Sequence, residues 1–140
     1  MGYQQAVSTY QKTSVETSDS VKLVIMCYDA AMKDLEDAKI LHESHSMEAT
    51  YDKIRHAQDI ITELLVGLDY ERGGEIAQNL SRLYNFMLRQ LIGVNSQQDT
   101  SVYNHLIRIL SELKDAWEHI RKNTNQLPEA NANRSWQASA

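Results

Sequence analysis

The chain contains one proline and five glycines among its 140 residues. Both residues interrupt helices and form tight turns, and an all-β sandwich or barrel needs many such turns. Their scarcity therefore disfavours a β fold and favours long helices. The single cysteine, Cys27, excludes an internal disulfide and fits a reducing compartment such as the cytoplasm.

Basic clusters and long apolar runs are also missing. Acidic residues outnumber basic ones by 19 to 14, and no basic run exceeds a pair. This argues against nucleic-acid binding, which normally requires a basic stripe. The longest run without a polar residue, Leu23 to Tyr28, is far shorter than the about 20 residues that cross a bilayer. Residues 1–18 lack the apolar core of a signal peptide, so we expect a cytoplasmic protein without membrane insertion.

Four segments carry helical periodicity. Apolar residues recur at spacings of three and four within residues 19–42, 46–70, 74–95 and 99–122. Similar lengths and short polar connections are typical of antiparallel neighbours. The sequence therefore predicts an all-α fold, an antiparallel up-down-up-down four-helix bundle over residues 18–123. A short N-terminal helical segment is expected within residues 1–17, and a disordered tail at residues 124–140, which are polar and aperiodic.

Gly73 and Gly74 stand between the second and third segments. Glycine readily adopts the left-handed conformation that closes a helix. We therefore expect one of these two residues to end the second helix and reverse the chain.

The third segment has apolar residues outside its main stripe. That stripe includes Leu83 and Met87, but Leu88 lies ~80° away, and Phe86 and Ile92 lie ~120° away on opposite sides. The apolar arc is roughly 240°, whereas a helix with one buried face needs little more than ~100°. The fourth segment also has an apolar stripe at spacings of four and three, which consists of Val102, Leu106, Ile109, Leu113, Ala116 and Ile120.

The first segment has a similar excess, because Ile25 and Met26 cannot both face the core if Val24 and Tyr28 do. Flanking residues and the terminal segments could cover this apolar surface. Alternatively, it forms a groove for an amphipathic partner.

The N-terminal segment offers a cover for such a groove. Tyr3, Val7 and Tyr10 recur at spacings of four and three, so a short helix there would have one apolar side. It is too short to be stable alone. We interpret it as a lid that the partner displaces, or as a static part of the core.

Catalytic and metal-binding patterns are weak. No Asp or Glu precedes a histidine by three residues, as a di-iron carboxylate bundle requires. His42 and His45 are three residues apart at a polar helix end, and we interpret them as a solvated pair. His105 has Arg108 at the third following position but Ile109 where histidine phosphotransfer domains carry glycine. We expect neither an enzyme nor a bound metal or cofactor.

Residues 57–95 contain Leu-Asp, then Gly-Gly-Glu-Ile-Ala, then Asn-Leu, Leu-Tyr and a closing Asn. In this order they resemble the flagellar export chaperones of the FliS family. The resemblance extends over roughly residues 3–120, because residues 22–39 and 110–117 are similar to the family's first and last helices. Tyr3 and Tyr10 match tyrosines that precede its bundle. Ser20, Cys27 and Ala30 depart from the family's usual Pro, Leu and Gly.

The resemblance implies a cytoplasmic chaperone that binds the disordered C-terminal segment of flagellin. It would prevent premature polymerisation and deliver flagellin to the flagellar type III export apparatus, with no cofactor. The alternatives are a structural four-helix-bundle homodimer and a non-catalytic signalling bundle, neither with a flagellin client. The client-binding groove is expected to use apolar and polar residues, namely Ile25, Met26, Phe86, Leu88 and Ile92 together with Asn79, Tyr84 and Asn95.

Overall fold

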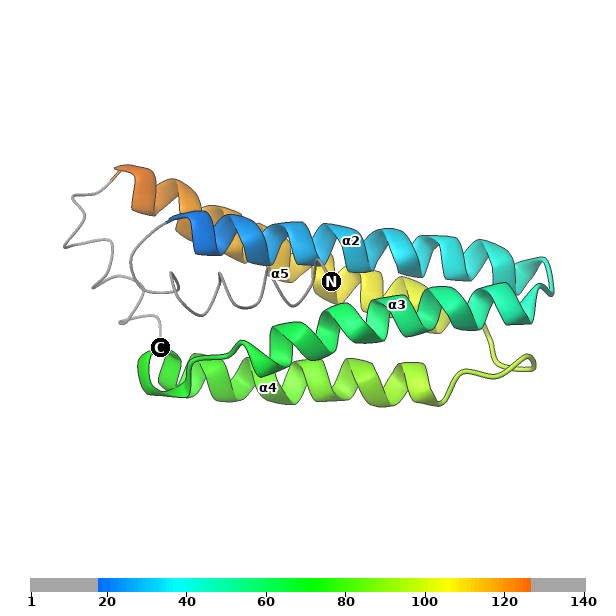
Figure 1. Cartoon of the computed structure of the whole chain (residues 1–140). Coiled ribbons are helices and arrows are strands. Elements are labelled where there is room, and N and C mark those ends of the chain that lie inside the picture. Colours follow the sequence, from blue (N-terminus) through cyan, green and yellow to red (C-terminus); the bar gives the residue numbers. More distant parts are fainter. Residues whose placement is uncertain (1–17, 127–140) are drawn as a thin grey trace.

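The computed structural model describes residues 18–126, which form four helices. These are α2 (Ser18–Glu43), α3 (Met47–Val66), α4 (Tyr70–Ile92) and α5 (Ser101–Gln126). Successive helices run in opposite directions (Figure 1), which confirms the predicted antiparallel bundle. The predicted lid residues Tyr3, Val7 and Tyr10 lie outside the described residues, as do residues 127–140.

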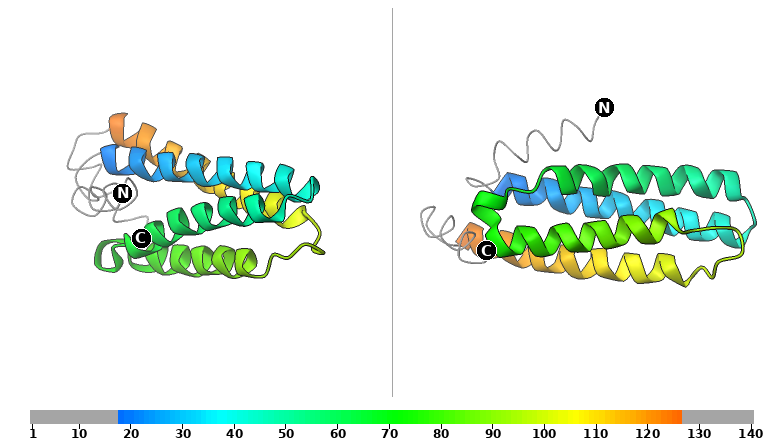
Figure 2. Two further views of the ribbon diagram at one scale, coloured as in Figure 1. Left: turned by 45° about the vertical axis from the view of Figure 1, so that its right-hand side comes forward. Right: turned by 90° about the horizontal axis from the view of Figure 1, so that it is seen from below.

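Helix α2 has two close neighbours. It packs directly against both α3 and α5, and α3 packs against α4, whereas the backbones of α4 and α5 lie farther apart. Figure 2 shows the α2–α5 pair and the α3–α4 pair diverging toward the end where α3 connects to α4. The four helices therefore do not contact one another equally.

Small residues let α2 approach its neighbours. Ala31 and Ala38 are fully buried, as is Leu35 between them, and all three continue the spacing of four and three that begins with Val24 and Tyr28. Short side chains at spacings of three and four lower the ridge between two helices, so the backbones come close. The periodic pattern of the first segment is thus confirmed as core.

The connection from α3 to α4 differs from the prediction. Helix α3 ends at Val66, and Gly67 follows it with a helical φ of −78°. The Asp69 carboxylate accepts a hydrogen bond from the Arg72 backbone N–H at 3.1 Å, so α4 begins before the glycine pair. Gly74 has a φ of 50° and a ψ of −123°, which kinks α4 near its start. The expectation of a positive φ is confirmed at Gly74, but its assignment as the end of the second helix is wrong.

Replacing Gly74 with alanine is expected to lower the free energy of unfolding by about 1–3 kcal/mol, because a Cβ strains this backbone conformation. Gly93 provides the control, since its φ is −79° and the nearest atoms to an added Cβ are 3.6 Å away. There alanine is expected to be neutral or slightly stabilising. Urea unfolding of both variants measures the difference, and equal midpoints would contradict the prediction.

None of the helices in residues 18–126 combines the length and apolar character needed to span a bilayer.

Candidate interaction surface

Three aromatic residues join α2, α4 and α5 inside the bundle. The Tyr28 and Tyr84 hydroxyls are hydrogen-bonded at 2.6 Å, and the Trp117 indole N–H donates to the Tyr28 oxygen at 2.9 Å. All three side chains are buried. Large side chains with a polar end fill the wider space between the helices and satisfy one another's hydrogen bonds. Tyr84 is therefore a core residue, and its predicted place on an exposed groove is wrong.

Ile25 is also buried, with 6 % of its surface exposed. Asp29, one helical turn later on the same flank, forms an ion pair with Lys114 of α5 at 2.8 Å. Because α5 covers this flank, Ile25 faces the interface between α2 and α5. The expectation that Ile25 lies outside the core is wrong, since α2 has a neighbour on both sides.

Cys27 lies on the opposite flank, which α3 covers. Asp34 lies seven residues later on that flank and forms a hydrogen bond with His56 of α3, with 2.5 Å between Asp34 Oδ2 and His56 Nδ1. Burial, and to a lesser extent the charge of Glu63, raises the pKa of the Cys27 thiol. A protonated, buried thiol is a poor nucleophile, so Cys27 serves here as a packing residue. Of residues 23–28 only Met26 projects outward, between the flank that α3 covers and the flank that α5 covers, and 55 % of its surface is exposed.

The two flanks of α4 have different surroundings. Phe86 packs edge-on against His105 of α5, with ring centroids 6.0 Å apart, so its flank faces α5. Asn79, two turns earlier, is on the same flank and is exposed. Leu88 and Ile92 are one turn apart on the opposite flank, where Leu88 is partly buried and Ile92 is 74 % exposed.

A line of partly exposed apolar side chains follows the boundary between α4 and α5, which we call the α4–α5 seam. Leu83 and Phe86 contribute from α4, and Ile109 and Leu113 from α5. Leu83 is three residues from Phe86, and Ile109 is four residues from His105, so each lies on the flank that faces the other helix. These side chains pack on the core without being covered, because the α4 and α5 backbones lie apart.

The predicted site residues do not form one groove. Phe86 and Asn79 lie at the seam, Leu88 and Ile92 lie on the other flank of α4, and Met26 lies on α2. Asn95 is exposed beyond α4, where its side chain accepts a hydrogen bond from the Gln97 backbone N–H at 2.9 Å. The partial exposure of the seam residues Leu83, Ile109 and Leu113 was not predictable from their spacing, which places them in stripes typical of buried residues.

His42 departs from the predicted solvated pair. It is 4 % exposed, and its Nδ1 is 2.8 Å from the Tyr103 hydroxyl, whereas His45 is exposed in the following turn. The two histidines therefore have different environments. Within residues 18–126 no group of three His, Cys, Asp or Glu residues is arranged to hold a metal ion.

The buried Tyr103 hydroxyl leads to a prediction at high pH. Burial, with a smaller effect from Tyr51, raises the pKa of Tyr103 to about 12. The folded state favours the neutral phenol, so Tyr103 contributes fully to the free energy of unfolding below pH ~10. As the pH rises toward 12 this contribution is lost, and the free energy of unfolding falls by about 2 kcal/mol. Chemical denaturation between about pH 10 and about pH 12 measures the free energy of unfolding. We expect it to fall less steeply with pH in Tyr103→Phe than in Tyr51→Phe. Equal pH dependences of the two variants would refute this assignment.

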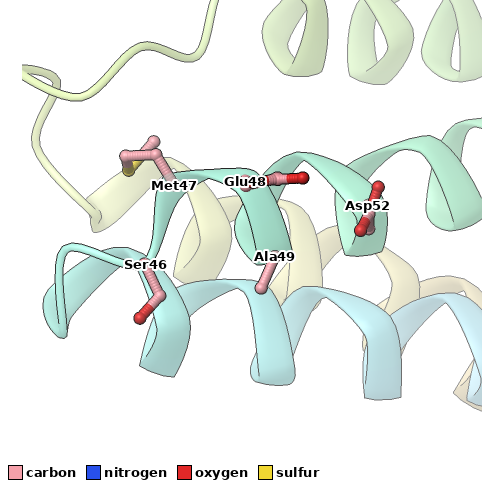
Figure 3. A pocket seen from close by; sticks show the side chains of 5 residues that line it. All are labelled: Ser46, Met47, Glu48, Ala49 and Asp52. Carbon is pink, nitrogen blue, oxygen red and sulfur yellow. The ribbon is translucent and has the colours of Figure 1, made fainter.

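A surface depression lies at the start of α3, beside the end of α2 (Figure 3). Five side chains line it: Ser46, Met47, Glu48, Ala49 and Asp52. Its two carboxylates are too few to hold a metal, and its lining mixes polar and apolar side chains. We assign it no function.

The model of the family described as flagellar protein FliS matches residues 3–124. The chain belongs to this family. A flagellar secretion chaperone FliS of Salmonella typhimurium is 34% identical over 119 residues, which cover 81% of this chain and 88% of the relative. The FliS of Vibrio cholerae is 32% identical over 82% of this chain and 88% of its own length. A flagellar secretion chaperone FliSB of Pseudomonas aeruginosa is 32% identical, covering 83% of this chain and 95% of the relative.

The motif that resembles FliS has clear structural roles in this FliS chain. Asp69 caps α4, Gly74 supplies the positive φ of the kink, and the Tyr84 hydroxyl is hydrogen-bonded to that of Tyr28. Gly73 has a packing reason, because an added Cβ would be 2.9 Å from the Ala77 Cβ. The motif therefore sets how α4 starts and how it is held against α2.

Proposed function

We propose that this FliS chain is a cytoplasmic export chaperone for flagellin. It binds the disordered C-terminal segment of flagellin, prevents premature polymerisation and delivers the client to the flagellar type III export apparatus. The family and the names of its relatives, which are flagellar secretion chaperones, support this proposal. Its action is binding rather than catalysis, and it needs no cofactor.

The observation that carries the proposal is the α4–α5 seam. Partly exposed Leu83, Phe86, Ile109 and Leu113 form an apolar line between two helices whose backbones lie apart. An amphipathic helix buries its apolar face in a surface of this kind. A client helix along the seam would complete the burial that α4 and α5 leave unfinished.

Further contacts follow if the client continues around α4. Leu88, Ile92 and Asn95 lie on or beyond the far flank of α4, and Met26 projects from α2. Coupled folding of a disordered segment typically buries about 1,000–3,000 Å². A client that wraps the bundle explains why exposed apolar residues occur on several faces.

Calorimetric titration with a peptide covering the C-terminal region of flagellin from the same organism tests this proposal. We expect one-to-one binding and a negative heat-capacity change, because apolar surface is buried. Sedimentation of the chain alone and with the peptide addresses the homodimer alternative. A tight dimer that the peptide does not change would favour a structural homodimer and count against a client groove.

The N-terminal segment remains a proposed lid through Tyr3, Val7 and Tyr10. Deleting residues 1–12 is expected to raise the association rate of the flagellin peptide, because the N-terminal segment no longer has to dissociate from the groove before the client binds. Stopped-flow fluorescence measures that rate. An unchanged rate together with a lower unfolding midpoint would indicate a static part of the core.

A further inference from the structure

The carboxyl-terminal half of α4 and the first half of α5 are nearly free of acidic residues. Between Glu75 and Glu112 the only acidic residue is Asp99, although the chain contains 19 acidic residues in 140. Asp99 lies two residues before α5, and its carboxylate accepts a hydrogen bond from the backbone N–H of Ser101, the first residue of that helix, at 2.7 Å. The same stretch carries Arg82, Arg89 and Arg108, so it is positive within a chain of net charge −5.

These arginines border the α4–α5 seam. Arg82 and Arg89 are exposed and seven residues apart, which places them on one line along α4 about 10 Å apart. The contact of Phe86 with His105 sets the register between α4 and α5. Arg108 is one turn from His105 in the same direction as Arg82 is from Phe86, so Arg82 and Arg108 lie at one level on the two sides of the seam.

The three guanidinium groups have no carboxylate partner among the described residues. Several other basic side chains pair with acids, as Lys33 does with Asp37 and Lys114 with Asp29, both within 3 Å. Arg82 instead donates to the neutral Asn79 side-chain oxygen at 2.6 Å. An arginine presents a planar fork of donors that suits carboxylates, and these forks are available next to an apolar line.

We propose that the seam selects an acidic client helix, whose carboxylates meet Arg82, Arg89 and Arg108 while its apolar face covers Leu83 and Phe86. This inference rests on the proposed chaperone function and specifies the chemistry of the client segment. A protein segment fits better than a nucleic acid, since apolar side chains separate the arginines and the rest of the chain is acidic. Carboxylates seven residues apart on the client match the spacing of Arg82 and Arg89.

Calorimetry with the C-terminal flagellin peptide tests this in about 0.1 M and about 1 M NaCl, where charges are screened beyond about 10 Å and 3 Å. In the low salt, the double variant R82Q/R108Q is expected to bind about tenfold more weakly than the wild-type chain. R82K/R108K should recover much of that loss. The control K22Q/K122Q removes the same net charge from exposed sites away from the seam and should bind within about twofold of the wild-type chain.

High salt should weaken wild-type binding and leave R82Q/R108Q nearly unchanged. If the wild-type chain binds the peptide equally at both salt concentrations, or R82Q/R108Q binds as tightly as the control, the acidic-client inference is overturned and the chaperone proposal stands. If the wild-type chain forms no complex at either concentration, both are overturned. Circular dichroism checks that the variants remain helical, and the salt dependence of the wild-type chain decides the question without any substitution.

Discussion

Replacing Ile25 with aspartate is expected to unfold much of the bundle, whereas the same replacement at the neighbouring Met26 leaves it folded. Ile25 is 6 % exposed at the interface of α2 with α5, and Met26 is 55 % exposed. The two residues are adjacent in one helix, so helix propensity and sequence context are closely matched. Burial alone separates them.

The expected cost at Ile25 has two parts. Losing the buried side chain removes about 2–3 kcal/mol of hydrophobic stabilisation. Burying a carboxylate without a partner, or protonating it, costs several kcal/mol more. The sum approaches the about 5–15 kcal/mol that stabilises a typical domain. At Met26 the carboxylate stays in water, and the change is expected to be within about 1 kcal/mol.

Urea unfolding followed by circular dichroism measures both variants, with Ile25→Val as a conservative control that should cost about 0.5–1.5 kcal/mol. If Ile25→Asp retained the wild-type midpoint and lost only peptide binding, Ile25 would be a surface contact. The burial of Ile25 between α2 and α5 would then be incorrect.

Shortening the two α4 residues of the seam is expected to have the largest effect on client binding. The double variant Leu83→Ala with Phe86→Ala should weaken binding of the flagellin peptide about a hundredfold or more, because apolar anchors at an interface centre each contribute about 2 kcal/mol or more. Both side chains are partly exposed in the free protein, so the bundle should remain folded at a modest cost in stability.

Ile40 provides the matched control. It is 61 % exposed on α2 and lies outside the proposed groove, so Ile40→Ala should leave the affinity within about twofold of the wild-type value. Ile92→Ala should give a smaller loss than the double variant, because Ile92 is the last residue of α4 and lies on its far flank. A large loss at Ile92 with none at Leu83 and Phe86 would place the client on the opposite flank.

The positions of several residues were predictable from local patterns. Apolar residues at spacings of three and four predicted four helices, and each predicted segment overlaps one of the four observed helices. The positive φ was expected at Gly73 or Gly74 and is found at Gly74. These features depend on neighbours in sequence, through backbone hydrogen bonds and steric limits on φ, so the sequence can indicate them.

The surface was much less predictable. A helical wheel places Ile25, Met26 and Tyr84 by angle, but whether an angle is exposed depends on which helix lies beside it. Because α2 is covered by α3 and α5, its apolar arc is broad and Ile25 is core. Because its hydroxyl is hydrogen-bonded to that of Tyr28, Tyr84 is buried despite its polar group and does not serve as a surface contact.

The amino-acid sequence by itself determined the all-α class, the four helices and membership of the FliS family. Only the tertiary structure decided that the α4 and α5 backbones lie apart, so that Leu83, Phe86, Ile109 and Leu113 form a partly open seam. The same packing brings Arg108 level with Arg82 through the contact of Phe86 with His105. The physical reason is that helix formation is set by interactions within a few residues, whereas exposure and charge proximity depend on distances between helices far apart in the chain.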